Sequence, residues 1–263
     1  MPFRPLVART IASVLGGPEV RERAARVGFA DAGHGYDRFG MHPDFVALAD
    51  AATGPLHDRY FRVVSHDPQH IPATGPAILA ANHSGTLPTD AMMLWTDVLR
   101  NTDPPRVARP VADYFVSTLP VVSTLFARCG VVGGSRGNAR ALLEAGELLM
   151  IFPEGVAGIG KPFRERYTLR PFRPGHAELA IRHRAPVVPV GIVGAEEQMP
   201  QIAAIPLPVR IHILYGEPLR FDLEHRPEDA DDPEIVRDAV RRVEEAVRAL
   251  VARGLRERRG VFR

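Results

Sequence analysis

The stretch ILAANHSGTLPTDAMML, residues 78–94, decides the fold. Its apolar run stops at Asn82 and His83, and a loop of small residues leads to Asp90, where a helix is expected to begin. A short apolar run, a tight turn and a helix in succession are typical of an α/β sheet. The sequence therefore places a histidine and a carboxylate on the two sides of one strand-to-helix turn.

The rest of the chain repeats this alternation. Four apolar runs are predicted as strands: 77–81, 148–152, 187–194 and 209–216. Helical segments lie between and after them, which predicts an α/β fold with a central mixed β-sheet flanked by helices.

Two of these helices have readable ends. The helix at 138–146 has Ser135 or Asn138 available as N-cap and Gly146 as its stop. Residues 233–259 carry valine, leucine and isoleucine near a helical period. We expect this closing helix to pack on the sheet; a membrane-binding helix is the less favoured alternative.

Length and composition set broad limits. The 263 residues can bury a full core, and we divide them into a helical and loop-rich segment at 1–60 and a main domain at 61–263. The single cysteine, Cys129, excludes an intrachain disulfide and a multi-cysteine zinc site.

Charge and hydropathy bear on partners and location. The net charge is only +2, and no arginine–aromatic interleaving or nucleic-acid motif is present, so nucleic acid is not expected as a partner. The longest uncharged run, 114–126, is too short to span a membrane and contains Pro120. Arg9 interrupts the apolar N-terminus, which disfavours a signal peptide. We expect a protein that is soluble or sits on a membrane surface.

His83 and Asp90 form the first candidate site. A neutral imidazole accepts a proton near neutral pH, and a carboxylate on its other nitrogen fixes the tautomer and stabilises the imidazolium. Such a pair activates a hydroxyl or a water as nucleophile. The alternative is that Asp90 only caps the helix and His83 is incidental.

Two glycine-containing loops add candidate residues. The loop CGVVGGSRG, 129–137, lacks the Gly-Lys-Ser/Thr ending of a nucleotide loop. It fits either an anion site served by Arg136 or a turn with a solvated arginine. In 152–167, Glu154 presents an acceptor for a substrate hydroxyl or an arginine, and Gly155 lets the backbone approach a ligand. The cations Lys161, Arg164 and Arg166 follow and could contact phosphate.

The apolar run 187–194 contains Pro189. Proline cannot donate a ladder hydrogen bond, so this strand is expected at a sheet edge or with a bulge.

Together these segments resemble the glycerolipid acyltransferase family. The first family motif, Asn-His followed by Asp, is matched by Asn82, His83 and Asp90. The later motifs are matched in order by the following ranges: the loop 130–136, Phe-Pro-Glu-Gly at 152–155, and Val-Val-Pro-Val at 187–190. The resemblance covers roughly residues 61–220 and implies a glycerol-3-phosphate acyltransferase-like fold.

One feature departs from the common pattern. Six residues separate His83 from Asp90, where the usual motif has four. The longer form resembles the branch of monoacylglycerol and diacylglycerol acyltransferases. Gly85 and Pro88 give the enlarged loop the freedom and the helix start that the contact requires.

The resemblance also implies a mechanism. His83 takes the proton of an acceptor hydroxyl, Asp90 orients His83, and the oxygen attacks the thioester of acyl-CoA or acyl carrier protein. No acyl-enzyme is needed, so neither Cys129 nor Ser84 has to be a nucleophile. Backbone N–H groups near Gly85 are candidates for the oxyanion. The implied substrate-binding residues are Asn82, Ser84, Gly85, Arg136, Glu154, Gly155, Lys161 and Arg164.

The resemblance implies that no metal or bound cofactor is needed. The implied partners are a lipid acceptor, the acyl donor and a membrane surface, so we expect a cytoplasmic protein that associates peripherally with the membrane. The run 115–126 is expected either to contact the interface or line an acyl tunnel, or else to form a core helix broken by Pro120. Two alternatives to acyl transfer remain open: a hydrolase in which His83 activates water or Ser84, and a non-catalytic lipid-binding module on the same fold.

Overall fold

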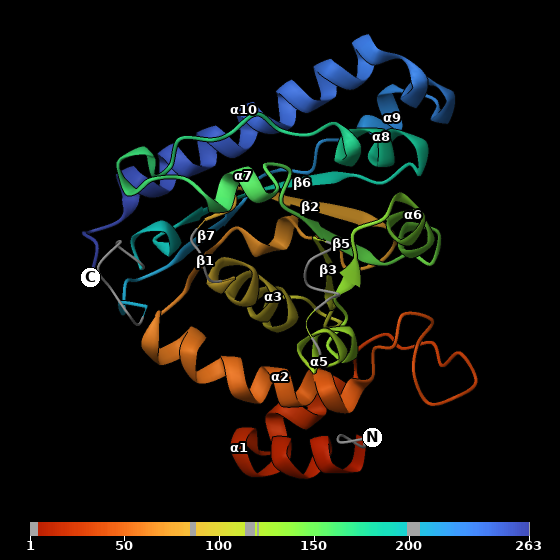
Figure 1. Ribbon diagram of the computed structural model, residues 1–263, viewed down its shortest axis with the longest axis vertical. Helices are drawn as coiled ribbons and strands as arrows, with labels where there is room; N and C mark the ends of the chain where they lie inside the picture. Colours follow the sequence, from red (N-terminus) through yellow and green to blue (C-terminus); the bar gives the residue numbers. More distant parts are fainter. Residues whose placement is uncertain (1–4, 85–87, 114–118, 120, 199–205, 263) are drawn as a thin grey trace.

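The computed structural model describes residues 5–84, 88–113, 119, 121–198 and 206–262, and it shows one sheet between two layers of helices (Figure 1). The strands are β1 (Val64–His66), β2 (Ala77–Ala81), β3 (Ala108–Ala112), β4 (Val132–Gly133), β5 (Leu148–Ile151), β6 (Val187–Val193) and β7 (His212–Tyr215). The α-helices are α1 (Pro5–Ala25), α2 (Pro43–Pro55), α3 (Thr89–Asn101), α5 (Val122–Arg128), α6 (Arg136–Glu144), α7 (Val156–Ile159), α8 (Gly175–Arg182), α9 (Phe221–Glu224) and α10 (Pro233–Glu257).

Shorter helical turns connect these elements. A π-helical turn, η1 (Leu56–Tyr60), follows α2 directly. Four 3₁₀ turns complete the set: η2 (Pro68–His70), η3 (Phe163–Glu165), η4 (Ala195–Glu197) and η5 (Pro227–Asp231).

The sheet is mixed, as predicted. Its strand order is β1-β7-β6-β2-β5-β3-β4. Strands β6, β2, β5, β3 and β4 are mutually parallel, β7 is antiparallel to β6, and β1 is parallel to β7. All four predicted strands are present, and β1, β3 and β4 were not predicted.

Strand β3 was missed because its sequence, ARPVA, includes an arginine and a proline. Arg109 is nevertheless 0% exposed. Its guanidinium pairs with Asp37 at 2.8 Å and donates to the carbonyl of Gly130 at 2.9 Å. A buried cation is tolerated when it is paired in this way, and these partners are distant in sequence.

Strand β6 lies inside the sheet although it contains Pro189. Three residue steps separate Val187 from Val190, whereas their partners on the neighbouring segment, Leu219 and Tyr215, are four steps apart. The extra residue opposite Pro189 makes a bulge, so the missing N–H costs no regular ladder bond. The expected bulge is confirmed, and the alternative of an edge strand is wrong.

Two helical layers cover the sheet (Figure 1). On one face α3 packs on the strands, α2 lies behind α3, and α1 packs on α2. On the other face α6, α8 and α10 bury apolar residues against the sheet. Val236, Val243, Val247 and Val251 of α10 are buried, which confirms the packed closing helix.

The predicted ends of the inner helices agree with the structure. The Ser135 side chain caps α6 by accepting from the backbone N–H of Asn138, and Gly146 has φ 76° just beyond the helix. α3 begins at Thr89, one residue before Asp90.

The first 60 residues share a core with the sheet. Val27, Met41 and Val46 belong to the same buried cluster as residues of β2, β5 and α3. The proposed boundary at residue 60 coincides with the end of η1.

Helix α5 contains the described part of the predicted interfacial run. No side chain of α5 is buried, and Leu119, Val121, Val122 and Leu125 are all well exposed. This excludes the core-helix alternative for the described residues of the run; residues 114–118 and 120 lie outside them. Among the described residues, no helix combines the length and apolar character needed to cross a membrane.

Candidate active site

The candidate site lies beyond the carboxyl ends of two adjacent parallel strands. β2 and β5 pair directly, with Ala80 opposite Ile151. His83 follows the end of β2, and Glu154 follows the end of β5. Open α/β sheets bind ligands at this edge, so the fold brings together two motifs that are 71 residues apart.

The predicted contact between His83 and Asp90 is present. His83 Nδ1 lies 2.6 Å from Asp90 Oδ2. A carboxylate can only accept, so Nδ1 carries the proton and Nε2 presents its lone pair. Asp90 is 0% exposed, and its oxygens also accept from the backbone N–H groups of Ser84 at 2.8 Å and Ala91 at 2.7 Å. The enlarged loop therefore brings the carboxylate to the ring.

The ring of His83 is held on a second side by Phe152. The two rings stack with centroids 4.2 Å apart and an interplanar angle of 25°. Gly158 adds to this packing, because a Cβ at that position would lie 2.9 Å from His83 Cβ. Nε2 makes no hydrogen bond to any described residue, and the side chain is 13% exposed. One nitrogen is fixed and the other is open.

Asn82 and Ser84, on either side of His83, serve the backbone. The Asn82 amide donates to Ile192 O at 3.0 Å and accepts from Ile192 N at 2.7 Å, which fastens the end of β2 to β6. The Ser84 hydroxyl donates to Asp90 Oδ2 at 3.3 Å. Both residues are 0% exposed. In the structure both side chains thus make hydrogen bonds within the protein at the positions where substrate contacts were predicted.

Glu154 turns its carboxylate back toward the loop of His83. Oε1 accepts from the backbone N–H of His83 at 2.9 Å. Oε2 accepts from the backbone N–H of Arg170 at 2.7 Å and from Lys161 Nζ at 3.2 Å. Glu154 is 1% exposed. Its oxygens are occupied by the protein, so it holds His83 in place and does not face a substrate hydroxyl as predicted.

Lys161 is buried between two carboxylates. Its side chain is 3% exposed and lies 3.2 Å from Glu154 and 3.1 Å from Glu196. Burial raises the pKa of Glu196, and the charge of Lys161 opposes that rise. The ammonium is paired and enclosed, and its contacts in the structure are with the protein's own carboxylates. One sequence signal marks this position: Lys161 is the only lysine among 33 basic residues.

Gly155 makes room for an arginine that the sequence analysis missed. Gly155 has φ +58°, and a Cβ there would lie 2.9 Å from Arg173 Cζ. The backbone N–H of Arg173 donates to Pro153 O at 3.0 Å, which ties its segment to the Phe-Pro-Glu-Gly loop. The guanidinium makes no ion pair with a described residue, in contrast to Arg170, which pairs with Glu165 at 2.7 Å.

The other predicted cations lie at the surface. Arg136 is 83% exposed and 3.2 Å from Glu178, and it follows β4, three strands away from β2. At about 4.8 Å per strand this is roughly 14 Å to the side of His83. Arg164 is 84% exposed and 3.5 Å from Glu165. The structure does not bring either one to His83.

Two further predicted features have different outcomes. Gly85 lies outside the described residues. Burial raises the pKa of the Cys129 thiol to about 12. The thiol is therefore protonated at neutral pH, in agreement with the expectation that it is not a nucleophile.

Comparison with known proteins shows the family of this chain. The sequence profile of the family described as Acyltransferase matches residues 62–193, the span that contains β2, α3, β5 and β6. The chain belongs to the acyltransferase family. The acyltransferase match includes both halves of the candidate site, His83 with Asp90 and the loop of Glu154.

The acyltransferase has relatives in bacteria and animals. An uncharacterized protein of Mycobacterium tuberculosis is 32% identical over 255 residues, covering 86% of this chain and 71% of that protein. A human DGAT1/2-independent enzyme synthesizing storage lipids is 25% identical over 176 residues, covering 60% of this chain and 53% of that enzyme.

A solved structure supports the fold. The crystal structure of the 1-acyl-sn-glycerophosphate (LPA) acyltransferase PlsC from Thermotoga maritima superposes with a TM-score of 0.62. It is 20% identical in sequence and covers 97% of this chain and 96% of that chain. The predicted fold class is confirmed.

Proposed function

We propose that this acyltransferase moves a fatty acyl group from an acyl-CoA or acyl-carrier-protein thioester to the hydroxyl of a glycerolipid-type acceptor. The observation that carries the proposal is the 2.6 Å contact between His83 Nδ1 and Asp90, while Nε2 bonds to no described residue. An imidazole held in this way is suited to general base catalysis.

The proposed reaction needs no covalent enzyme intermediate. The acceptor hydroxyl gives its proton to His83 Nε2, and its oxygen forms a bond to the thioester carbon. The tetrahedral intermediate collapses, the carbon–sulfur bond breaks, and the thiol leaves with the proton that His83 returns. Asp90 stabilises the imidazolium between these two transfers.

The acceptor is proposed to be an uncharged glycerolipid. The spacing of six residues between His83 and Asp90 resembles the monoacylglycerol and diacylglycerol branch, and one relative is named for storage lipid synthesis. Two cations that were expected to bind phosphate are poorly placed for a phosphorylated acceptor, because Lys161 is enclosed and Arg164 is solvated. Arg173, beside Gly155, is the best-placed cation for a phosphate of the donor.

Lipid substrates require access to a membrane, and two exposed apolar surfaces support this. Leu6, Val14 and Leu15 of α1 are 60–80% exposed. The apolar side chains of α5 are exposed as well, and α5 packs against α2. We propose that α1 and α5 contact the bilayer surface.

The hydrolase alternative is weakened by the position of Ser84. Its hydroxyl is buried and bonds to Asp90, so it is not paired with His83 Nε2 as a nucleophile requires. Activation of water by His83 remains as the competing reaction.

An acceptor panel tests the proposal. Thiol release from one acyl-CoA, and separately from one acyl carrier protein, is followed with monoacylglycerol, diacylglycerol, lysophosphatidate and glycerol 3-phosphate, each with a no-acceptor control. Release that requires a neutral acceptor supports the proposal. Equal release without acceptor indicates hydrolysis, and release that requires a phosphorylated acceptor overturns the acceptor assignment. Lipid binding without thiol release would identify a non-catalytic module.

A further inference from the structure

A second histidine–aspartate pair has its carboxylate on the same helix as the first. His57 Nε2 is 3.0 Å from Asp97 Oδ1, and His57 Nδ1 is 2.8 Å from Asp58 Oδ1. Asp97 follows Asp90 by seven residues, which is two turns of α3, so both carboxylates project from one face of the helix about 10 Å apart. A displacement of one therefore moves the other.

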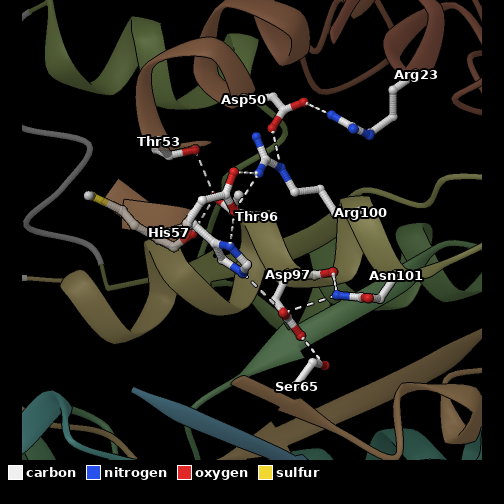
Figure 2. Close-up of polar contacts among 11 residues, drawn as sticks. Arg23, Asp50, Thr53, His57, Ser65, Thr96, Asp97, Arg100 and Asn101 are labelled. Carbon is white, nitrogen blue, oxygen red and sulfur yellow. Dashed lines mark hydrogen bonds and ion pairs between the residues drawn. The ribbon is translucent and has the colours of Figure 1, made fainter. Parts of the chain in front are cut away.

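Asp97 accepts hydrogen bonds from four residues, and Figure 2 shows those from His57, Ser65 and Asn101. Besides His57, it accepts from Asn101 Nδ2 at 3.0 Å, Ser65 Oγ at 2.8 Å and Tyr215 Oη at 2.7 Å. Its side chain is 1% exposed. These donors come from η1, α3, β1 and β7, so one carboxylate fixes the helix to the sheet and to the turn after α2.

The charges around His57 balance. On its own turn His57 faces Asp58; α3 contributes Asp97 and Arg100, which donates to Asp58 at 2.7 Å. Asp50 of α2 accepts from Arg100 at 2.8 Å and also pairs with Arg23 of α1 (Figure 2). On the β7 side the facing titratable group is Tyr215, bound to Asp97. Three cations thus meet three carboxylates when His57 is protonated.

Geometry favours the charged form of His57. Both ring nitrogens face carboxylate oxygens, which only accept, so the ring donates on both sides only as an imidazolium. Burial lowers the pKa of His57, but the hydrogen bonds and charges of Asp97 and Asp58 outweigh it and the net shift is upward. Loss of the proton would turn a nitrogen lone pair toward a carboxylate, either that of Asp97, whose side chain is 1% exposed, or that of Asp58, whose side chain is 56% exposed.

The setting of His57 is unusual for a purely structural residue. It occupies a π-helical turn, a rare element that recurs at functional sites. The turn joins the helical layer of α2 to β1, because the backbone N–H of Val63 donates to His57 O at 2.8 Å.

We propose that protonated His57 is a positioning residue that, through Asp97, holds α3 in the register where Asp90 orients His83, and that loss of its proton sets the alkaline limit of acyl transfer. This inference rests on the proposed function for its activity readout. Its structural readout, the His83–Asp90 hydrogen bond, does not depend on the substrate.

The test is a pH titration of the full-length protein followed by NMR and by kcat. The downfield proton on His83 Nδ1, assigned by its loss in Asp90→Asn, reports the active pair, and the ring signals of His57 report its protonation. In the wild type we expect the Nδ1 signal and kcat to decline together as His57 loses its proton. If they persist after His57 has titrated, the proposal is overturned.

Two substitutions sharpen the result. His57→Gln is expected to lower kcat at neutral pH about 10- to 100-fold with little change in KM, as expected when reacting groups are slightly misplaced. His57→Lys keeps the charge and is expected to move the alkaline decline to higher pH. The exposed His34→Gln is the matched control and should behave as the wild type. Wild-type kcat and an unchanged alkaline limb in both His57 variants would overturn the proposal.

The two hypotheses fail in different ways. If no acceptor or donor is turned over, the proposed function fails, while the NMR titration still tests the coupling of His57 to the His83–Asp90 pair. If either His57 variant does not fold, the wild-type titration alone decides, because it compares the midpoint of His57 with that of the His83 signal.

Discussion

Helix α3 provides the aspartates of two histidine–aspartate pairs, and the two histidine rings differ in how many carboxylates surround them. In the pair at its first turn, His83 uses one nitrogen for Asp90 and leaves the other open at the edge of the sheet. In the pair two turns later, His57 uses both nitrogens for carboxylates and is enclosed by α2, α3 and the sheet (Figure 2). The residue types are the same, and the number of carboxylates on the ring distinguishes a histidine with one unpaired nitrogen from a histidine with both nitrogens paired.

The difference shows that the hydrogen-bond partners of a histidine ring decide whether one of its nitrogens can accept a proton. A ring with one carboxylate keeps a lone pair for a substrate proton, whereas a ring between two carboxylates keeps its own proton. Asp90 and Asp97 are both fully buried, so burial alone does not distinguish an active pair from a structural one.

The largest expected effects come from breaking the pair of His83 and Asp90, called the open pair because one ring nitrogen bonds to no described residue. His83→Ala removes the proposed base and should lower kcat by about 1,000-fold. Asp90→Asn should lower kcat by a similar factor because the amide favours the wrong tautomer of His83. Steady-state kinetics, with circular dichroism as the control for folding, measures both. Near-wild-type turnover in either variant would contradict the mechanism.

Breaking the pair of His57 and Asp97 should lower stability as well as kcat. Asp97→Asn leaves the imidazolium of His57 without one of its two anions, and the loss of one partner from a buried ion pair typically costs about 3–4 kcal/mol. Urea unfolding at pH 7 measures this change. Because Asp97 is distant from the substrate, KM is expected to stay near the wild-type value; a large increase in KM with unchanged stability would contradict this assignment.

A third histidine, His176, should make stability depend on pH in the opposite direction from His57. Burial lowers the pKa of His176 to about 4, because no carboxylate compensates it. The unfolded chain binds this proton more readily, so the free energy of unfolding should fall by up to about 3 kcal/mol as the pH drops from 6.5 to 4.

The raised pKa of His57 has the opposite sign. Its stabilisation is complete below the ordinary histidine pKa of 6.5 and is lost as the pH rises through the raised value. Urea unfolding across pH, with His57→Gln and His176→Gln, separates the two contributions. If His57→Gln retains the whole alkaline decline, or His176→Gln the whole acid decline, the corresponding assignment is wrong.

The smallest expected effect tests the support of the open pair. Lys161→Met keeps a long unbranched side chain but leaves Glu154 and Glu196 facing each other without a cation. Because Glu154 holds the backbone of His83, kcat should fall about 10-fold with little change in KM. Lys161→Arg, which keeps the charge, should recover part of the loss. A selective rise in KM would instead support the original expectation that Lys161 contacts substrate.

The sequence predicted the local half of the site well. Strand, turn and helix are contiguous at 77–101, so the apolar pattern placed His83 and Asp90 on the two sides of one turn, and the family resemblance implied their contact. The bulge at Pro189 and the cap at Ser135 were predicted for the same reason: each follows from the chemistry of a few neighbouring residues.

The roles of Glu154 and Lys161 were not predictable in this way. Both lie in a recognisable motif, but whether a charged side chain faces a substrate or another charge depends on which segments pack over it. Here Glu196, from the turn after β6, reaches back to Lys161 and closes the cluster. The buried Arg109 of β3 was missed for the same reason, since its partner Asp37 precedes it by 72 residues.

The sequence by itself determined an α/β sheet and the order of its motifs, because these depend on backbone preferences over short spans, and its resemblance to a family implied one histidine–aspartate contact. Only the tertiary structure decided that His57, forty residues before Asp97, would lie between two carboxylates. Burial and partner count set the proton affinity of a ring, and both arise when distant helices and strands pack together.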